Sequence, residues 1–263
     1  MIIGHKKEQE IIKRILENYK KGAFILIGPE GIGKFYTLKT LLNNSSINDV
    51  IFIDSEENIL KLQTAHLIQK LLSLSSEEKR VIAVNDAHKL NKEAQNSLLK
   101  IIEEIKANAL LFFVTHRPYK ILPTIRSRMQ KIPFKLVPKE EIRKYLASQK
   151  IAEQTIELVL KIFPGQIGTI IKVLKNKDTF NFLAKLYTSK DDFEKIYNIL
   201  LSEEKIDLKE ALTYFIHIER INLLKKDKAS IYRIKFLESL YQDSDYALNK
   251  TLQLSNVLLN LNG

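Results

Sequence analysis

Short apolar runs alternate with amphipathic segments over the first half of the chain. Five runs rich in Ile, Val or Phe have the length of strands that are buried on both faces of a sheet: Ala23–Ile27, Val50–Ile53, Val81–Val84, Leu110–Val114 and, more weakly, Ile132–Phe134. Segments with helical periodicity separate them: Glu8–Tyr19, Lys34–Leu42, Ile59–Leu72 and Lys92–Ile105. Strands that alternate with helices predict an α/β domain with a mostly parallel sheet.

After Pro138 the strand pattern ends and only helical patterns remain. Three short helices are expected first, over Lys139–Gln149, Ala152–Phe163 and Gln166–Lys175, and four or five more over 180–262. All six Pro and seven of the eight Gly lie at or before Gly168, which favours a long helical C-terminal part. We therefore expect three units: an α/β core over 1–136, a small helical unit over 137–178 and an all-α domain over 179–263.

The composition is that of an ordinary globular protein. Of the 263 residues, 45% are hydrophobic and 28% charged, and Cys is absent, which excludes disulfides and Cys-ligated zinc or iron–sulfur sites. No apolar stretch is long enough to span a membrane, and the N-terminal residues lack the apolar segment of a signal peptide. We expect a soluble, cytoplasmic protein with no membrane partner.

The net charge of +11 is unevenly distributed. Residues 180–263 hold twelve basic and twelve acidic side chains, so the excess lies in 1–179, and residues 105–139 hold eight basic side chains and no acidic one. A basic face attracts nucleic acid through counterion release. A solvated, Lys-rich surface has the same composition, and charge alone favours this second interpretation.

The first predicted strand leads into a glycine-rich segment of phosphate-loop type. Gly28, Gly33 and Lys34 fit the spacing G-x-x-x-x-G-K, and a helical pattern follows. In such a loop, backbone N–H groups and the helix N-terminus bind phosphate oxygens, and the Lys neutralises them. We expect phosphate binding, without hydrolysis, by the residues Gly28, Pro29, Gly31, Gly33 and Lys34.

Two oxygen ligands that such a site needs for Mg²⁺ are missing. Phe35 stands where a Ser or Thr hydroxyl is required, and Asn85 follows the third predicted strand where an Asp is usual. Asp86 then stands in the position of a general base, or caps the helix that begins near Asn91, and we favour capping. Because the γ-phosphate charge would be uncompensated, the sequence predicts no metal site and no intrinsic ATPase activity.

Several motifs together resemble the AAA+ clamp-loader family. They are Ile3-Gly4-His5, the phosphate loop, Asn85-Asp86-Ala87-His88-Lys89-Leu90, Ala94-Gln95-Asn96-Ser97-Leu98-Leu99-Lys100, Glu103-Glu104, Val114-Thr115-His116-Arg117-Pro118 and Leu122-Pro123-Thr124-Ile125-Arg126-Ser127-Arg128-Met129. The resemblance covers about residues 1–175 in order and spacing. It implies a RecA-like parallel-sheet core, a helical lid and an all-α collar that joins five subunits in a ring.

The resemblance also implies roles for individual residues. Arg128 falls on the arginine finger that the family inserts into a neighbouring subunit's ATP site, although Arg126 and Lys131 nearby would also fit a generic basic surface. Thr115 falls on the sensor position, and Thr169 stands where the family's lid often has an arginine. No cofactor is required, and ATP or ADP would bind weakly, without Mg²⁺-dependent turnover.

The implied partners are a motor ATPase subunit and a delta subunit in a hetero-pentamer, and, through that complex, the sliding clamp and primer–template DNA. A non-hydrolysing subunit that assembles the ring and lends Arg128 to its neighbour is the leading hypothesis. An active ATPase with unconventional metal ligation and a DNA-binding module on a vestigial AAA+ fold are the alternatives.

Overall fold

The computed structural model describes residues 1–54, 62–73, 78–105, 108–176, 216, 219 and 230–243. The described residues belong to two compact units. The first contains residues 1–151 and 164–169, and the second contains 152–163 and the described residues from 170 onward. The predicted boundaries after residues 136 and 178 stay predictions.

Five parallel strands form the sheet of the first unit, in the order β2-β3-β4-β1-β5. Their bounds are Gly22–Ile27 for β1, Asp49–Ile53 for β2, Arg80–Val84 for β3, Ala109–Thr115 for β4 and Gln130–Pro133 for β5. All seven residues of the central strand β4 are buried, whereas three of the four residues of β5 at the edge are exposed. The parallel α/β core predicted from the alternating pattern is confirmed.

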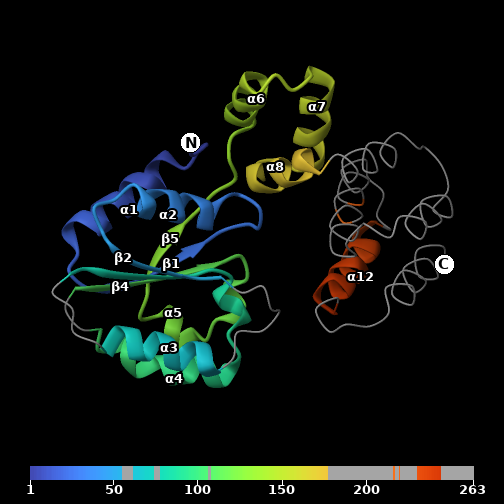
Figure 1. The fold of residues 1–263 in the computed structure, drawn as a ribbon. Coiled ribbons are helices and arrows are strands. Elements are labelled where there is room, and N and C mark those ends of the chain that lie inside the picture. The colour runs from blue at the N-terminus through green and yellow to red at the C-terminus, as the bar shows by residue number, and fades with distance from the viewer. Residues whose placement is uncertain are drawn as a thin grey trace. The chain divides into compact units, whose positions relative to one another are not determined.

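Helices cover both faces of this sheet (Figure 1). On one face lie α1 (Lys6–Asn18) and α2 (Lys34–Asn43), and on the other lie α3 (Leu62–Ser73), α4 (Lys92–Glu103) and α5 (Pro123–Arg126). Along β4 the side chains alternate between the two layers: Phe112 packs with the α1–α2 layer and Phe113 with the α3–α4 layer. Burial on both faces is why these strands have continuous apolar sequences.

The carboxyl ends of the parallel strands meet at one edge of the sheet, and the loops that follow them hold the candidate site. The phosphate loop follows β1, Asn85 follows β3 and His116 follows β4. Short 3₁₀ helices lie after two of these strands, at Ala87–Lys89 and Pro118–Lys120. The sheet thus brings together segments that are far apart in the sequence.

The helices after the sheet are α6 (Lys139–Ser148), α7 (Glu153–Ile162), α8 (Ile167–Lys175) and α12 (Ser230–Asp243). The first three confirm the three short helices expected after Pro138. The other helices predicted over 180–262, and most of the predicted collar, lie outside the described residues. None of the helices in the described ranges has both the length and the apolar character needed to cross a membrane.

Candidate functional site

The predicted phosphate loop lies between β1 and α2. Gly31 (φ +71°) and Gly33 (φ +92°) have left-handed backbone conformations that residues with a side chain rarely adopt. At Gly28 a Cβ would lie 2.4 Å from the carbonyl oxygen of Phe134, so this close approach also requires glycine. The loop ends at the N-terminus of α2, where unpaired N–H groups and the helix dipole favour an anion.

Neighbouring segments hold the loop in place. His5 donates a hydrogen bond from Nε2 to the carbonyl oxygen of Ile32 over 2.8 Å. The backbone N–H groups of Gly168 and Thr169 both donate to the carbonyl oxygen of Gly31, over 2.7 and 3.2 Å. Three hydrogen bonds from within the first unit therefore hold the backbone of the loop.

Lys34 is buried and faces the loop itself. Its Nζ donates to the carbonyl oxygen of Gly28 over 2.8 Å and to that of Pro29. Burial lowers the pKa of Lys34 to about 8, although the carboxylates of Glu30 and Asp86 act in the opposite direction. A phosphate would compete with the loop's own carbonyl oxygens for this cation.

Phe35 stands at the predicted position of the first metal ligand, and Thr37, the next residue with an aliphatic hydroxyl along α2, is buried. Phe35 packs against the apolar layer of α1 and α2, and its ring makes an edge-to-face contact with Phe52, 6.0 Å between centroids. Thr37 is 1% exposed, and within the described structure its hydroxyl has no hydrogen-bond partner. The residue that follows Lys34 therefore has no hydroxyl group.

Asn85, at the second metal position, is engaged by the neighbouring strand. Its Nδ2 donates to Oδ1 of Asp54 over 2.9 Å, and its backbone N–H donates to the carbonyl oxygen of Ile53 over 2.8 Å. Asp54 is an acid at this edge of the sheet that the sequence analysis did not identify. The amide of Asn85 neutralises none of its charge but orients its carboxylate.

Asp86 adopts a left-handed conformation (φ 47°) and forms ion pairs. Its Oδ2 lies 3.5 Å from Nζ of Lys89, and its Oδ1 lies 3.6 Å from Nδ1 of His116. Burial raises the pKa of Asp86, but His116 and the nearby positive charges outweigh it and lower the pKa to about 2. The preferred capping role is wrong, because Asn91 itself caps α4 by accepting the N–H of Ala94 over 2.8 Å.

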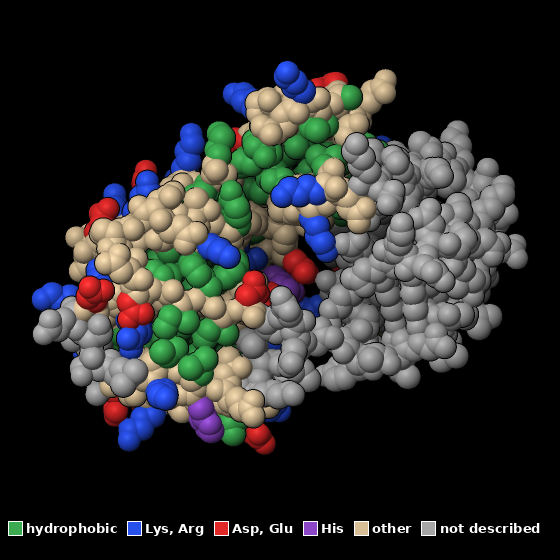
Figure 2. Space-filling view, in the orientation of Figure 1, with side chains coloured by type: hydrophobic (Ala, Val, Ile, Leu, Met, Phe, Trp, Pro, Cys, Tyr) green, Lys and Arg blue, Asp and Glu red, His purple; other side chains and the backbone are tan. Residues whose placement is uncertain are grey.

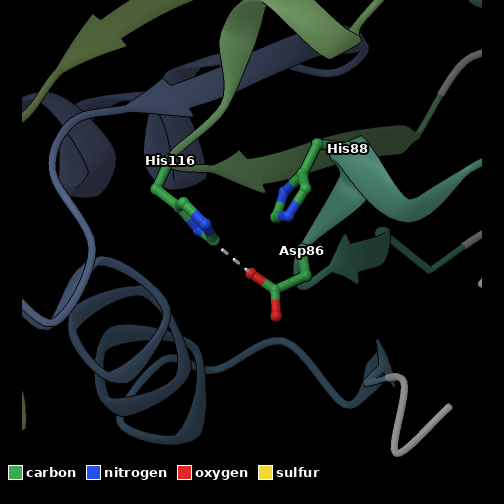
Figure 3. A group of neighbouring side chains, drawn as sticks. All are labelled: Asp86, His88 and His116. Carbon is green, nitrogen blue, oxygen red and sulfur yellow. Dashed lines mark ion pairs between the residues drawn. The ribbon is translucent and has the colours of Figure 1, made fainter. Parts of the chain in front are cut away.

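Two histidines complete a cluster with Asp86 (Figure 3). The rings of His88 and His116 meet edge to face with centroids 4.3 Å apart, and Nε2 of His116 lies 3.4 Å from Oε2 of Glu30. Burial, helped by the positive charges of His116, Arg117 and Lys89, lowers the pKa of His88 to about 3 despite the opposing effect of Asp86. His88 is therefore a neutral imidazole at physiological pH.

This cluster of Asp86, His88 and His116 was not predicted from the sequence. The sequence contains one indication of the cluster, which is the position of its histidines. His88 and His116 each follow a strand at the carboxyl edge of a parallel sheet, and β3 pairs directly with β4. Single histidines at distant positions carry no such information until the strand order is known.

The sensor position after β4 is satisfied locally. The hydroxyl of Thr115 is fully buried, lies 3.2 Å from Nδ1 of His88 and accepts the backbone N–H of Arg117 over 3.0 Å. Thr169, at the predicted lid position, donates to Oε1 of Gln166 over 3.3 Å. A threonine side chain carries no positive charge to offer to a nucleotide.

Arg128 follows α5 and is partly exposed at 39%. Its Nε donates to Glu103 of α4, and its Nη1 donates to the carbonyl oxygen of Thr124 over 2.9 Å. Among the described residues, the contacts of Arg128 are with Glu103 and Thr124 and not with the chain's own phosphate loop. Its guanidinium is thus held at the surface by groups that solvent or a partner can replace.

Comparisons with known proteins agree with the geometry. A family model described as DNA polymerase III, delta subunit, matches residues 37–138. The DNA polymerase III subunit gamma/tau of Mycobacterium tuberculosis is 44% identical over 75 residues, which are 28% of this chain and 13% of the relative. The DNA polymerase III subunit delta' of Bacillus subtilis is 25% identical over 122 residues, 46% of this chain and 35% of the relative.

A solved structure shares the fold. The DNA polymerase III gamma subunit-related protein from Thermotoga maritima aligns with a TM-score of 0.58 and 20% identity, over 96% of this chain and 97% of the other. The chain therefore shares the fold of this solved structure. Over the matched residues it is similar to clamp-loader subunits of the AAA+ family. The matched regions cover only 13% of the length of the gamma/tau relative and 35% of the length of the delta' relative.

Proposed function

We propose that the chain is a non-hydrolysing, delta-prime-type subunit of a clamp loader. It helps to assemble the loader ring that places the sliding clamp on primed DNA, and it supplies Arg128 to the ATP site of a neighbouring subunit. The observation that carries the proposal is the loss of both metal ligands: Phe35 packs in the apolar layer, and Asn85 is bound to Asp54.

The loss of metal ligands acts on the chemical step more than on binding. Phosphoryl transfer depends on a cation that neutralises the charge shifting between the β- and γ-phosphates. The loop around Gly31 and Lys34 keeps its shape and its buried cation, so ATP or ADP binds weakly and is not turned over. We expect that the structural role requires no cofactor, and the hydrogen bonds from His5, Gly168 and Thr169 to the loop support this expectation.

Arg128 has the chemistry and the exposure that a trans-acting finger needs. A planar guanidinium pairs with two phosphate oxygens at once. The ion pair with Glu103 is partly exposed, and such pairs contribute little free energy. Replacing Glu103 by a partner's phosphate at a subunit interface therefore costs little free energy.

The test is reconstitution of the loader with its motor and delta subunits, the sliding clamp and primed DNA. With Arg128→Ala we expect an intact complex whose DNA-stimulated ATP hydrolysis falls by about 10³-fold or more, the usual effect of a lost arginine finger. Lys131→Ala, which removes an exposed neighbouring cation, is the matched control and leaves the rate unchanged. Unchanged hydrolysis in Arg128→Ala would remove the finger from the proposal.

One observation favours a second candidate, an active ATPase. Asp86 stands at the base position with a pKa of about 2, so its carboxylate is ionised. The charge of this carboxylate acts to raise the pKa of Lys34. Steady hydrolysis by the purified chain with Mg²⁺ and DNA, abolished by Lys34→Ala, would establish this candidate. We expect no turnover above the buffer rate.

A further inference from the structure

Asp86, His88 and His116 converge after two adjacent strands (Figure 3). Each offers one ligand atom, and these atoms lie within 4.8 Å of one another. Two imidazoles and one carboxylate are a common ligand set for zinc and related transition metals, whereas Mg²⁺ prefers oxygen ligands alone. Ligand atoms around a tetrahedral zinc lie about 3.4 Å apart, so small side-chain rotations bring the three within range.

Residues around the cluster lie close to ring nitrogens of the two histidines, as the outer residues of a metal site do. Metal-bound histidines usually use their other ring nitrogen in a hydrogen bond that fixes the ring. Thr115 lies 3.2 Å from Nδ1 of His88, and Glu30 lies 3.4 Å from Nε2 of His116. This leaves the second nitrogen of each ring for a metal, and in His116 that nitrogen, Nδ1, is the one that faces Asp86.

The two carboxylate oxygens of Asp86 also face different partners. Oδ2 pairs with Lys89 over 3.5 Å, and Oδ1 faces His116. A metal bound through Oδ1 therefore leaves the ion pair with Lys89 in place. His88 is 8% exposed, so one ligand is already desolvated and ordered before any metal arrives.

We propose that Asp86, His88 and His116 form a binding site for a divalent transition metal of the zinc type, at the carboxyl edge of the sheet. The three protein ligands leave a fourth position for water or an anion. The positive charges of Lys34, Lys89 and Arg117 oppose a cation here, and the carboxylates of Asp86 and Glu30 offset them. This proposal differs from the sequence prediction of no metal site, which stays a prediction.

The site has a structural consequence for the edge of the sheet. A metal would link the segment after β3 to the segment after β4, next to Glu30 of the phosphate loop, whose Oε2 lies 3.4 Å from Nε2 of His116. The inference does not rest on the proposed function, because it concerns the metal affinity of the isolated chain and not the loader's ATPase.

The experiment uses the full chain, stripped of metal by a chelator and then titrated with Co²⁺, whose visible absorption reports nitrogen and oxygen ligands in a tetrahedral site. We expect one Co²⁺ per chain, displaced by Zn²⁺ and not by Mg²⁺. His116→Ala and Asp86→Asn each lower the affinity by at least about tenfold. His66→Ala, which removes an exposed histidine of α3, leaves both the affinity and the spectrum unchanged.

Thermal unfolding without metal shows whether the variants keep their fold. Asp86→Asn preserves the size of the side chain, so it serves as the decisive variant if His116→Ala is poorly folded. Absence of stoichiometric Co²⁺ binding, or binding that Asp86→Asn and His116→Ala leave intact, would overturn the proposal. Loss of binding in His66→Ala would overturn it as well, because the metal would then be held at the surface of α3.

Discussion

At the scale of single residues, polar side chains of the site form hydrogen bonds with other groups of the same chain. Lys34 donates to the carbonyl oxygens of its own loop, Asn85 binds Asp54, and Arg128 binds Glu103. Each of these three side chains has a hydrogen-bond partner within the chain. Each of these interactions can therefore be tested by a single substitution.

The buried Lys34 predicts a dependence of stability on pH. Its pKa is about 8 in the folded chain and 10.5 in the reference state, so the unfolded chain binds more protons between these values and stability rises with pH there. The penalty for burying the cation is present below pH 8 and is lost as the pH rises toward 10.5. We expect the stability of the wild type relative to Lys34→Met to increase by about 2 kcal/mol between pH 7 and pH 9.5.

Chemical unfolding of both proteins across this pH range measures the effect. Lys7→Met, which removes an exposed lysine of α1, is the control and should show no such change relative to the wild type. A constant difference between wild type and Lys34→Met at all pH values would show that Lys34 is not desolvated.

The pair of Glu103 and Arg128 gives a second prediction at this scale. Glu103→Ala changes the free energy of unfolding by less than about 1 kcal/mol, because the ion pair is partly exposed. In the reconstituted loader it keeps or raises the ATPase rate, since Arg128 is released for the neighbouring site. A loss as large as that of Arg128→Ala would instead mean that Glu103 positions the guanidinium.

At the scale of elements, the important event is the docking of the phosphate loop on the start of α8. Gly31 accepts two backbone hydrogen bonds there, and a Cβ on it would lie 1.9 Å from Oγ1 of Thr169. The left-handed conformation of Gly31 adds strain for any side chain. We therefore expect substitutions at Gly31 and at Thr169 to affect stability together.

This docking predicts coupling between two positions. Gly31→Ala is expected to destabilise the chain by about 1–3 kcal/mol through strain and overlap. Thr169→Ala alone has a small effect, and in the double variant it recovers the part of the loss that arises from the hydroxyl. Gly28→Ala is the comparison, because its Cβ would meet the backbone oxygen of Phe134 at 2.4 Å and Thr169→Ala cannot relieve it.

Equilibrium unfolding of the four proteins in the Gly31–Thr169 cycle gives the coupling free energy. Strict additivity of the two substitutions would show that the loop and α8 separate readily in solution. A rescue of Gly28→Ala by Thr169→Ala would show that the second substitution acts nonspecifically.

At the scale of the whole molecule, the net charge of +11 requires an explanation. Figure 2 shows Lys and Arg side chains interspersed with Asp and Glu over the α/β part of the face in view. Such a mixed surface favours solvation and assembly over an extended nucleic-acid path. A basic face that acts on DNA only within a ring needs no high affinity in the isolated chain.

We therefore expect weak binding of primed DNA by the isolated chain, with an affinity that falls steeply as salt rises. Fluorescence anisotropy across a salt series measures both quantities, and the logarithmic slope counts the phosphates neutralised. Tight binding at moderate salt, reduced by Lys131→Glu and Lys135→Glu together, would favour the DNA-binding module over the clamp-loader subunit.

Sequence patterns predicted the sheet strands to within two residues at each end, and the physical reason is local. Strands that are buried on both faces are apolar throughout. A Gly-rich segment that lies between a strand and a helix and ends in Lys34 is typical of a phosphate loop. The same reasoning failed for Asp86, because the choice between capping and pairing depends on Asn91 and on which distant side chains lie nearby.

By itself the chain's order of residues determined the α/β class, the loop at Gly28–Lys34 and the absence of a hydroxyl at Phe35, since these follow from residue type and spacing. Tertiary structure alone decided that His88 meets His116, that Arg128 meets Glu103, and that Asn85 orients Asp54. Those pairs join positions at least 25 residues apart. Only the order of strands in the sheet and the packing of α4 against α5 set such distances, because no periodicity links them along the chain.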